Sequence, residues 1–257
     1  MKMKKTMIAL AFGAITASGS AMAWVEGGSG GSVDLGGTIT PDTTITSPWE
    51  VKVGSALTGL DAQISAGATS ASVRVPGDSL VLGVRSKDGW FTGAPGIAPQ
   101  LNYHGAVSGT YTRGVTDLTL DVKDVNTDQT IGSLTTKLTT AAMGSTRNAT
   151  TEGYYMLAAD NVGDAFFGGL ASNNPDQLYG DPQGLAARVD STVTEHYETV
   201  GSAQGIYPSA FNITDATYNA FYISALETAN AINIRLNNPV TSDVSWKASL
   251  PVTVTYQ

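Results

Sequence analysis

Apolar and polar residues alternate with a period of two over several segments of this chain. Leu118, Leu120 and Val122 alternate with polar residues, and after the polar stretch 126–129 a second extended run carries Ile131 and Leu134. Because successive side chains of a strand point to opposite faces, this pattern predicts a β-hairpin. Further strands are predicted at 49–53, 71–75, 80–84, 100–103, 231–236 and 250–256. Clusters of Gly, Pro, Asn and Asp separate these segments, which is typical of an antiparallel sandwich.

A central segment has a different period. Apolar residues recur there at every fourth position and are followed by Gly168 and Gly169; they are Tyr154, Ala158, Val162, Phe166 and Leu170. This spacing predicts a short amphipathic helix. Leu185, Val189, Val193 and Tyr197 share the spacing in a stretch rich in Thr and Val, so helix and strand remain equally open there. The region from about 143 to 207 is interpreted as an elaboration on a β scaffold.

The first 23 residues have the layout of a secretory signal peptide. Three lysines precede an apolar run, and Ala21-Met22-Ala23 offers a small-residue cleavage site. A membrane anchor needs about 20 consecutive apolar residues, and Ser18, Gly19 and Ser20 interrupt this run earlier. We therefore expect export of the remaining 234 residues.

Charge and cysteine content narrow the class of partner and compartment. Removal of the three leader lysines changes the formal net charge from −8 to −11. Nucleic acids and anionic membranes bind clustered cations, so neither is expected as a partner. The chain has no cysteine, and an exported protein of this length without disulfides is expected to be a bacterial product that buries its own core.

Three patterns with catalytic or metal-binding potential carry little weight. Residues 27–31 match G-x-S-x-G but lack the buried strand that must precede a nucleophile elbow. Asp124, Asn126 and Asp128 resemble a calcium loop, yet the sixth position is Gln129 instead of Gly, so a polar hairpin tip is the better interpretation. The two histidines, His104 and His196, lie far apart in sequence. We expect no catalytic site, metal or cofactor.

The C-terminal segment alternates almost to its last residue. Trp246, Ala248, Leu250, Val252, Val254 and Tyr256 fall on one face of the predicted strand. Chain termini fray unless something holds them. This strand is therefore expected to lie in a core or to be captured by a partner.

Four stretches carry a resemblance to a known family. Residues 24–40 (WVEGGSGGSVDLGGTIT), 49–60 (WEVKVGSALTGL), 153–170 (GYYMLAADNVGDAFFGGL) and 246–257 (WKASLPVTVTYQ) resemble the major subunits of enterobacterial chaperone-usher fimbriae of the FaeG type, in which the shaft subunit is itself the adhesin. The likeness covers essentially the whole mature chain and is weakest from about 173 to 213. It implies a surface fimbria as the location of the exported protein.

The resemblance implies an all-β, incomplete immunoglobulin-like sandwich over residues 41–257, with an inserted receptor-binding region at about 143–207. Members lack the last strand, and the N-terminal extension of the next identical subunit completes the fold. Residues 24–40 match that extension, and Val33, Leu35, Gly37 and Ile39 share the face that would enter the neighbour's groove.

The resemblance also implies partners before and after assembly. A periplasmic chaperone would dock on the strand that carries Leu250, Val252, Val254 and Tyr256 and would hold the carboxylate of Gln257. At an outer-membrane usher, the extension of the next subunit would replace the chaperone. A host-cell glycoconjugate would be the receptor. Residues with suitable chemistry in the matching segment are Tyr154, Tyr155, Asp160, Asn161, Asn173, Asn174 and Asp176.

Two other functional classes remain open. A secreted β-sandwich hydrolase would be active as a monomer and would not need residues 24–40 for assembly. A purely structural pilin would polymerise without binding a receptor.

Overall fold

The computed structural model describes residues 47–257, and the proposed signal peptide and the donor-strand residues Val33, Leu35, Gly37 and Ile39 lie outside this range. The described part consists almost entirely of strands with one short α-helix, in the order β1 (Trp49–Val53), β2 (Ser70–Arg74), β3 (Ser79–Ser86), β4 (Phe91–Thr92), β5 (Pro99–Asn102), β6 (Val107–Thr112), β7 (Val115–Asp124), β8 (Thr130–Arg147), β9 (Glu152–Ala158), α1 (Pro182–Val189), the 3-10 helix η1 (Ser191–Thr194), β10 (Ser202–Pro208), β11 (Thr217–Leu226), β12 (Ala231–Leu236), β13 (Trp246–Lys247) and β14 (Thr253–Tyr256). The expectation of an all-β fold is confirmed.

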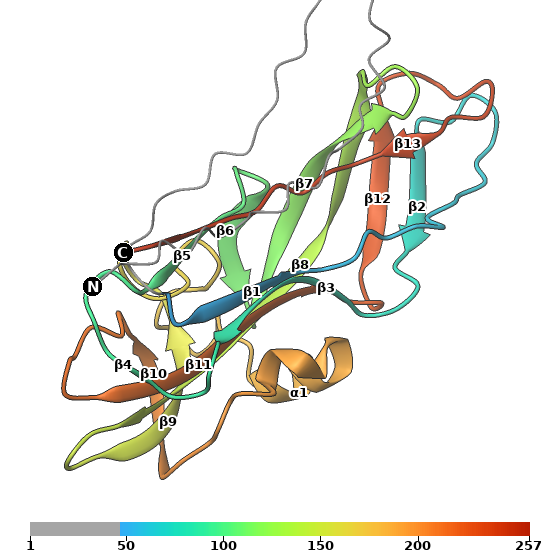
Figure 1. Ribbon diagram of the computed structural model, residues 1–257. Coiled ribbons are helices and arrows are strands. Elements are labelled where there is room, and N and C mark those ends of the chain that lie inside the picture. Colours follow the sequence, from blue (N-terminus) through green and yellow to red (C-terminus); the bar gives the residue numbers. More distant parts are fainter. Residues whose placement is uncertain (1–46) are drawn as a thin grey trace, which may run out of the picture. The chain divides into compact units, whose positions relative to one another are not determined.

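Most strands join one large branched sheet with the central order β1-β3-β11-β8-β12-β2 (Figure 1). The long strand β8 connects its parts, because it pairs with β7 and β12 through its first half and with β11 and β9 through its second. A separate pair, β14 with β5, holds the end of the chain.

The hairpin predicted from the alternation is formed by β7 and β8. Leu118 lies opposite Thr136 and Leu120 opposite Leu134 in an antiparallel pair. At its tip the Asp124 carboxylate accepts hydrogen bonds from the backbone N–H groups of Asn126 and Thr127, at 2.9 and 2.8 Å. The acidic pattern around residue 124 therefore closes a turn, in the manner of Asp side chains that bond to nearby backbone N–H groups.

The helix predicted over 154–170 is wrong. Strand β9 occupies the first part and pairs with β8 and β10, and an irregular loop follows. Gly163, Phe166 and Gly168 adopt left-handed backbone angles, with φ of 100°, 63° and 87°, which an α-helix of L-residues does not accommodate. The four-residue spacing does not mark a shared face either, because Phe166 is fully buried whereas Val162 is 64% exposed.

The second stretch with that spacing, left open between helix and strand, forms α1 and η1. Asp181 caps α1 by accepting a hydrogen bond from the Gly184 N–H at 2.9 Å, and Pro182 occupies the first helical turn. Both features favour a helix start. Leu185 and Val193 then pack against Phe221 and Ile223 of β11 in one buried cluster.

Aromatic rings form the core where β1 begins. Trp49 packs against Phe91, Phe166 and Phe211 with ring centroids 5.0, 5.7 and 5.3 Å apart. The Trp49 indole N–H also donates to the Ile97 carbonyl at 2.7 Å. The start of β1 is thereby fixed. No helix in residues 47–257 is long and apolar enough to cross a membrane.

Candidate functional site: an apolar groove and an open strand edge

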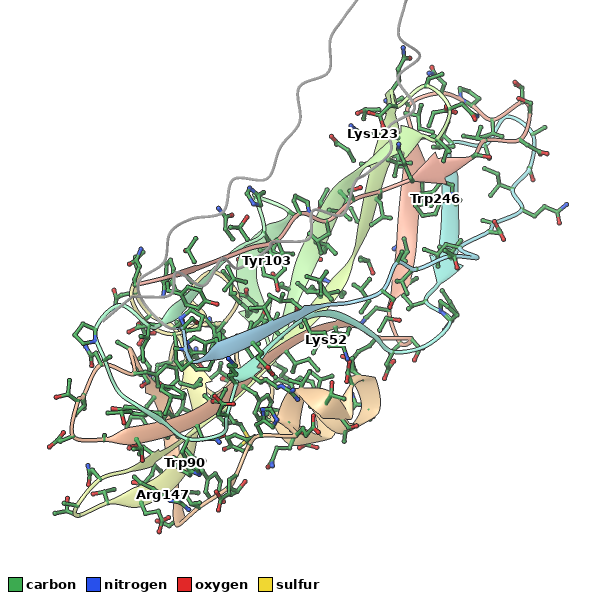
Figure 2. The ribbon with its side chains drawn as sticks, in the orientation of Figure 1. Lys52, Trp90, Tyr103, Lys123, Arg147 and Trp246 are labelled. Carbon is green, nitrogen blue, oxygen red and sulfur yellow. The ribbon has the colours of Figure 1, made fainter. Side chains whose placement is uncertain are left out.

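An apolar groove of about 1110 Å³ runs along one side of the sandwich. One rim is formed by residues 54–66, which continue β1, and the other by residues 240–250, which lead into and past β13. Side chains of β3, β7, β8 and β12 form its floor. Figure 2 shows Trp246, on the second rim, at the end of the domain near Lys123.

The floor of the groove is a hydrophobic core that is covered on only part of its surface. Leu118, Leu134 and Ile234 are buried there, at 1, 4 and 4% exposure. Towards the mouth, Leu120 and Leu250 are only partly buried. Since the two inner faces of a β-sandwich normally interdigitate, these half-covered side chains show that no element within residues 47–257 fully covers this part of the core.

The inner face of β1 is uncovered in the same way. Trp49, Val51 and Val53 share one face because strand side chains alternate. Trp49 is 6% exposed, whereas Val51 is 43% and Val53 69% exposed. The exposure of the apolar face of this edge strand therefore increases along the strand towards the groove.

The C-terminal segment shows the alternation that the sequence predicts. From Trp246 to Val254 every second residue is half-buried and the residues between them are exposed. Tyr256, at the end of this face, is 36% exposed. None of the apolar residues of this face is fully buried, so the strand is docked on the core without being enclosed by it.

The backbone of this segment is also only partly paired. Trp246 lies opposite Asp124 of β7, and Thr253 lies opposite Asn102 of β5. Residues 248–252 belong to no strand, and in the described part β13 and β14 have one strand partner each. An unpaired edge presents a row of N–H and C=O groups that can pair with another chain.

Short contacts fix the end of the chain beside the first described strand, β1. Gln257 and Ala98 exchange two backbone hydrogen bonds of 2.9 and 3.1 Å. His104 Nε2 lies 2.8 Å from Thr253 Oγ1. Because the neighbouring Ile97 accepts the indole N–H of Trp49, the first and last strands meet at residues 97–98.

The start of the C-terminal segment is held by an ionic contact at the opposite end. The Asp128 carboxylate, in the β7–β8 tip, lies 2.8 Å from Lys247 Nζ and 3.6 Å from Lys123 Nζ. The hydrogen bond from Lys247 and the charge of Lys123 lower the pKa of Asp128. The Asp128 carboxylate thus joins β13 to the tip of the hairpin.

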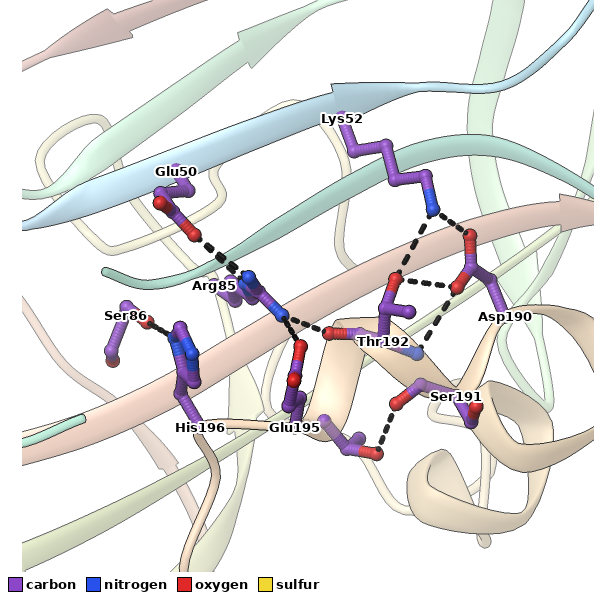
Figure 3. A network of polar contacts seen from close by, with 10 residues as sticks. Glu50, Lys52, Arg85, Ser86, Asp190, Ser191, Thr192, Glu195 and His196 are labelled. Carbon is purple, nitrogen blue, oxygen red and sulfur yellow. Dashed lines mark hydrogen bonds and ion pairs between the residues drawn. The ribbon is translucent and has the colours of Figure 1, made fainter. Parts of the chain in front are cut away.

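A network of charged groups attaches the helical segment to the outer side of β1 and β3 (Figure 3). Arg85 lies 2.9 Å from Glu50 and 2.8 Å from Glu195, and Lys52 lies 2.6 Å from Asp190. The hydrogen bond and charge of Arg85 lower the pKa of Glu195. The segment α1–η1 is therefore fastened to the strand that continues into the groove rim.

Three of the residues predicted to contact a receptor lie together. The Asn173 N–H donates to the Asp160 carboxylate at 2.8 Å, and the N–H groups of Asp160 and Asn161 donate to Asp164 at 2.9 and 2.7 Å. Asn174 and Asp176 form the next turn, where the Asp176 N–H donates to Asn174 Oδ1 at 3.0 Å. All five predicted polar residues are exposed.

The two tyrosines of that prediction lie on β9, before this loop begins. Tyr155 is 6% exposed and its ring packs edge-on against Tyr207, at 6.1 Å between centroids. Tyr154 is half-buried against the cluster that contains Leu185 and Phe221. The structure therefore brings the polar residues together and places the Tyr155 ring in the core.

The first rim of the groove was not identified from the sequence. Leu57 and Leu60 line the groove, but their spacing of three in SALTGLDAQ gives neither a strand nor a helix period. Residues 240–244 on the second rim likewise show no alternation. Of the two rims, only the part in the last strand had a sequence signal, its alternation.

These features define the class of protein: an immunoglobulin-like β-sandwich of the pilin type, with an open groove and an open last strand. The family model described as "Fimbrial, major and minor subunit" matches residues 3–257. The chain is 31% identical to the K88 fimbrial protein AB and 30% identical to the K88 fimbrial protein AC, both of Escherichia coli, over 99% of this chain and 100% of each relative. The chain belongs to the K88 family of fimbrial subunits. It is a non-enzymatic, adhesion-related component of a surface fimbria that assembles with other fimbrial subunits.

Proposed function

We propose that this chain is the major, adhesive subunit of its fimbria and that it polymerises by donor-strand exchange. Residues 24–40 of the next copy fill the groove, and Val33, Leu35 and Ile39 enter it while Gly37 passes a shallow part. The observation that carries this proposal is the groove of about 1110 Å³ beside a last strand that, in the described part, is paired along one edge only. Addition of a strand to an open edge is a recurrent mode of peptide recognition.

The free energy of such a joint comes from two sources. Burial of one aliphatic side chain contributes roughly 1.5–3 kcal/mol, and three enter the groove. The half-covered Leu120 and Leu250 of the acceptor gain burial at the same time. Backbone pairing along the open edge adds specificity for an extended segment.

An open apolar edge is also an aggregation hazard before assembly. We infer that a periplasmic chaperone covers the strand carrying Leu250, Val252, Val254 and Tyr256 and that its cations hold the Gln257 carboxylate. An outer-membrane usher then exchanges the chaperone for the next subunit. The incomplete burial of this alternating face supports this inference.

We further propose that the insertion binds a host glycoconjugate through the loop containing Asp160, Asn161 and Asn173, with Asn174 and Asp176 beside it. Their short polar side chains are exposed and can bond to sugar hydroxyls. Tyr154 borders this region from β9, whereas Tyr155 acts by supporting the strand from inside. Many copies along a fibre make up for weak binding at one site.

The donor-strand proposal is tested with two forms of the mature chain. One lacks residues 24–40, and the other carries that segment after Gln257 through a flexible linker. We expect the first to aggregate without a chaperone and the second to be a stable monomer, measured by size-exclusion chromatography and thermal melting. Equal stability of two monomers would refute a groove that needs filling and would reopen the hydrolase alternative.

A further inference from the structure

One end of the described domain carries two exposed valines next to each other. Val125, in the tip between β7 and β8, is 47% exposed, and Val244, just before β13, is 39% exposed. The Val125 N–H donates to the Ser245 carbonyl at 2.9 Å, so the two valines lie on adjoining backbone segments. Val244 also lines the groove. The pair therefore forms an end patch that is continuous with the groove.

This end patch is built on a fixed backbone. Asp128 links the hairpin tip to Lys247 at 2.8 Å, and Trp246 pairs with Asp124. Asp124 in turn closes the tip through bonds to the N–H groups of Asn126 and Thr127. A surface whose conformation is already set loses less entropy on docking than a flexible one.

The first described residues lie on the side of the domain away from the end patch. The Lys87 N–H donates to the Pro48 carbonyl at 2.8 Å, and Trp49 bonds to Ile97. Gln257 pairs with Ala98 at the same place. Figure 1 shows the C-terminus far from β13, on the side of the described domain where β4, β9 and β10 also lie. Ten residues of extended chain separate Trp246 from Tyr256, which corresponds to about 33 Å.

This arrangement sets the direction in which copies add. The donor segment 24–40 of the incoming copy could enter the groove from the side where the acceptor's residues 47–49 lie. The incoming domain would then crowd the side from which the acceptor's own donor segment has to extend. A chain that extends linearly requires entry from the end with Val125 and Val244. The incoming strand then runs antiparallel to the last strand, and its domain lies beyond the end patch. Ten residues from Ile39 to Trp49 allow a tether of at most about 33–36 Å, so that domain stays close.

We propose that the end patch formed by Val125 and Val244 is the docking surface for the body of the next copy of this chain, around that copy's Lys87 and Pro48. This inference rests on the proposed donor-strand exchange and adds a second contact outside the groove. Contact with the neighbour covers the two exposed valines and limits bending of the joint.

The absence of cysteine from the chain makes disulfide crosslinking a direct test. Val125→Cys is combined with Lys87→Cys in one chain, and Val244→Cys with Lys87→Cys in a second. A matched control combines Lys87→Cys with Ala187→Cys, an exposed position on α1. The distance of about 33 Å between the ends excludes a bond within one copy. Unchanged melting of the donor-complemented monomers verifies that each variant folds.

Fibres are assembled, oxidised and separated on denaturing gels with and without reductant. We expect both end-patch pairs to give a reducible ladder of covalent multimers and the Ala187→Cys control to remain monomeric. Fibres that form normally but give no ladder in either pair would overturn the end contact while leaving donor-strand exchange in place. Failure of all forms, including the unmodified chain, to polymerise would overturn donor-strand exchange and this inference with it.

Discussion

Tyr103 and Tyr222 share a hydrogen bond of 2.8 Å between their hydroxyls in the interior of the domain. Tyr103 donates its proton to Ser224 Oγ at 2.9 Å and accepts from Tyr222, whose hydroxyl also lies 3.2 Å from the Gly169 carbonyl oxygen. The two hydroxyls thus link strand β11 to the segment after β5 and to the loop after β9. Buried polar groups that are all satisfied in this way favour one packing arrangement over others.

This pair predicts a loss of stability at alkaline pH. Burial raises the pKa of Tyr103 to about 12, above the value near 10 of an unfolded tyrosine. The folded state therefore retains a proton that the unfolded state releases, and the stabilisation is complete below pH 10 and is lost as pH rises towards 12. Between pH 10 and 12 the free energy of unfolding should fall less steeply with pH in Tyr103→Phe, by about 1.4 kcal/mol per pH unit. Denaturant unfolding at several pH values measures the slope, and parallel profiles for both proteins would contradict the assignment.

Gly168 illustrates a second constraint on single residues. Its φ is 87°, and a Cβ at this position would collide with the Leu101 carbonyl. Gly105 has a similar φ of 80° but open space around its Cβ position. Gly168→Ala should therefore cost clearly more than Gly105→Ala, for which a backbone penalty of about 1–2 kcal/mol applies. Thermal melting of donor-complemented monomers compares the two, and equal losses would show that the contact with Leu101 relaxes at little cost.

At the scale of elements, the strands were predictable where one face is buried and the other exposed. The β7–β8 hairpin and β12 follow directly from such alternation. The helix over 154–170 was not predictable from spacing, because the conformation of that loop depends on contacts with distant β5. The Phe166 N–H donates to the Pro99 carbonyl and the Leu101 N–H to the Phe167 carbonyl. The candidate receptor site was not predictable in full for the same reason. Its residues Asp160 and Asn173 are joined by a hydrogen bond across 13 positions of the sequence, which composition alone does not reveal.

The half-buried face of the last strand gives a prediction for that element. Leu250→Ala in the donor-complemented domain should cost about 2–5 kcal/mol, as for large-to-small changes in a filled core. Ser249→Ala, on the exposed face one residue earlier, should change stability by less than about 0.5 kcal/mol. Without the donor segment the Leu250 side chain is only partly covered, so the difference between the two variants should shrink. A cost for Leu250→Ala that does not depend on the donor segment would show that the donor segment does not cover Leu250.

At the scale of the whole molecule, one fibre presents many copies of the loop that contains Asn161. Loss of one hydrogen bond to a sugar corresponds to about 0.5–1.5 kcal/mol. Asn161→Ala should therefore weaken glycan binding by the complemented monomer roughly 2- to 12-fold and binding by the fibre by a larger factor, since several sites engage together. Asn238→Ala, at an exposed position outside this loop, is the matched control. Glycan-array and cell-binding assays on monomer and fibre measure both, and unchanged binding of all forms would argue for a purely structural subunit.

The lengthwise course of the open edge has a mechanical consequence. In a fibre built as proposed, the incoming strand lies parallel to the line of pull, because the edge runs from the end patch to the C-terminus. Traction on the fibre then acts on all backbone bonds of the joint at once, in shear, and does not peel them apart one after another. The joint needs no covalent crosslink for this resistance, which suits a chain without cysteine.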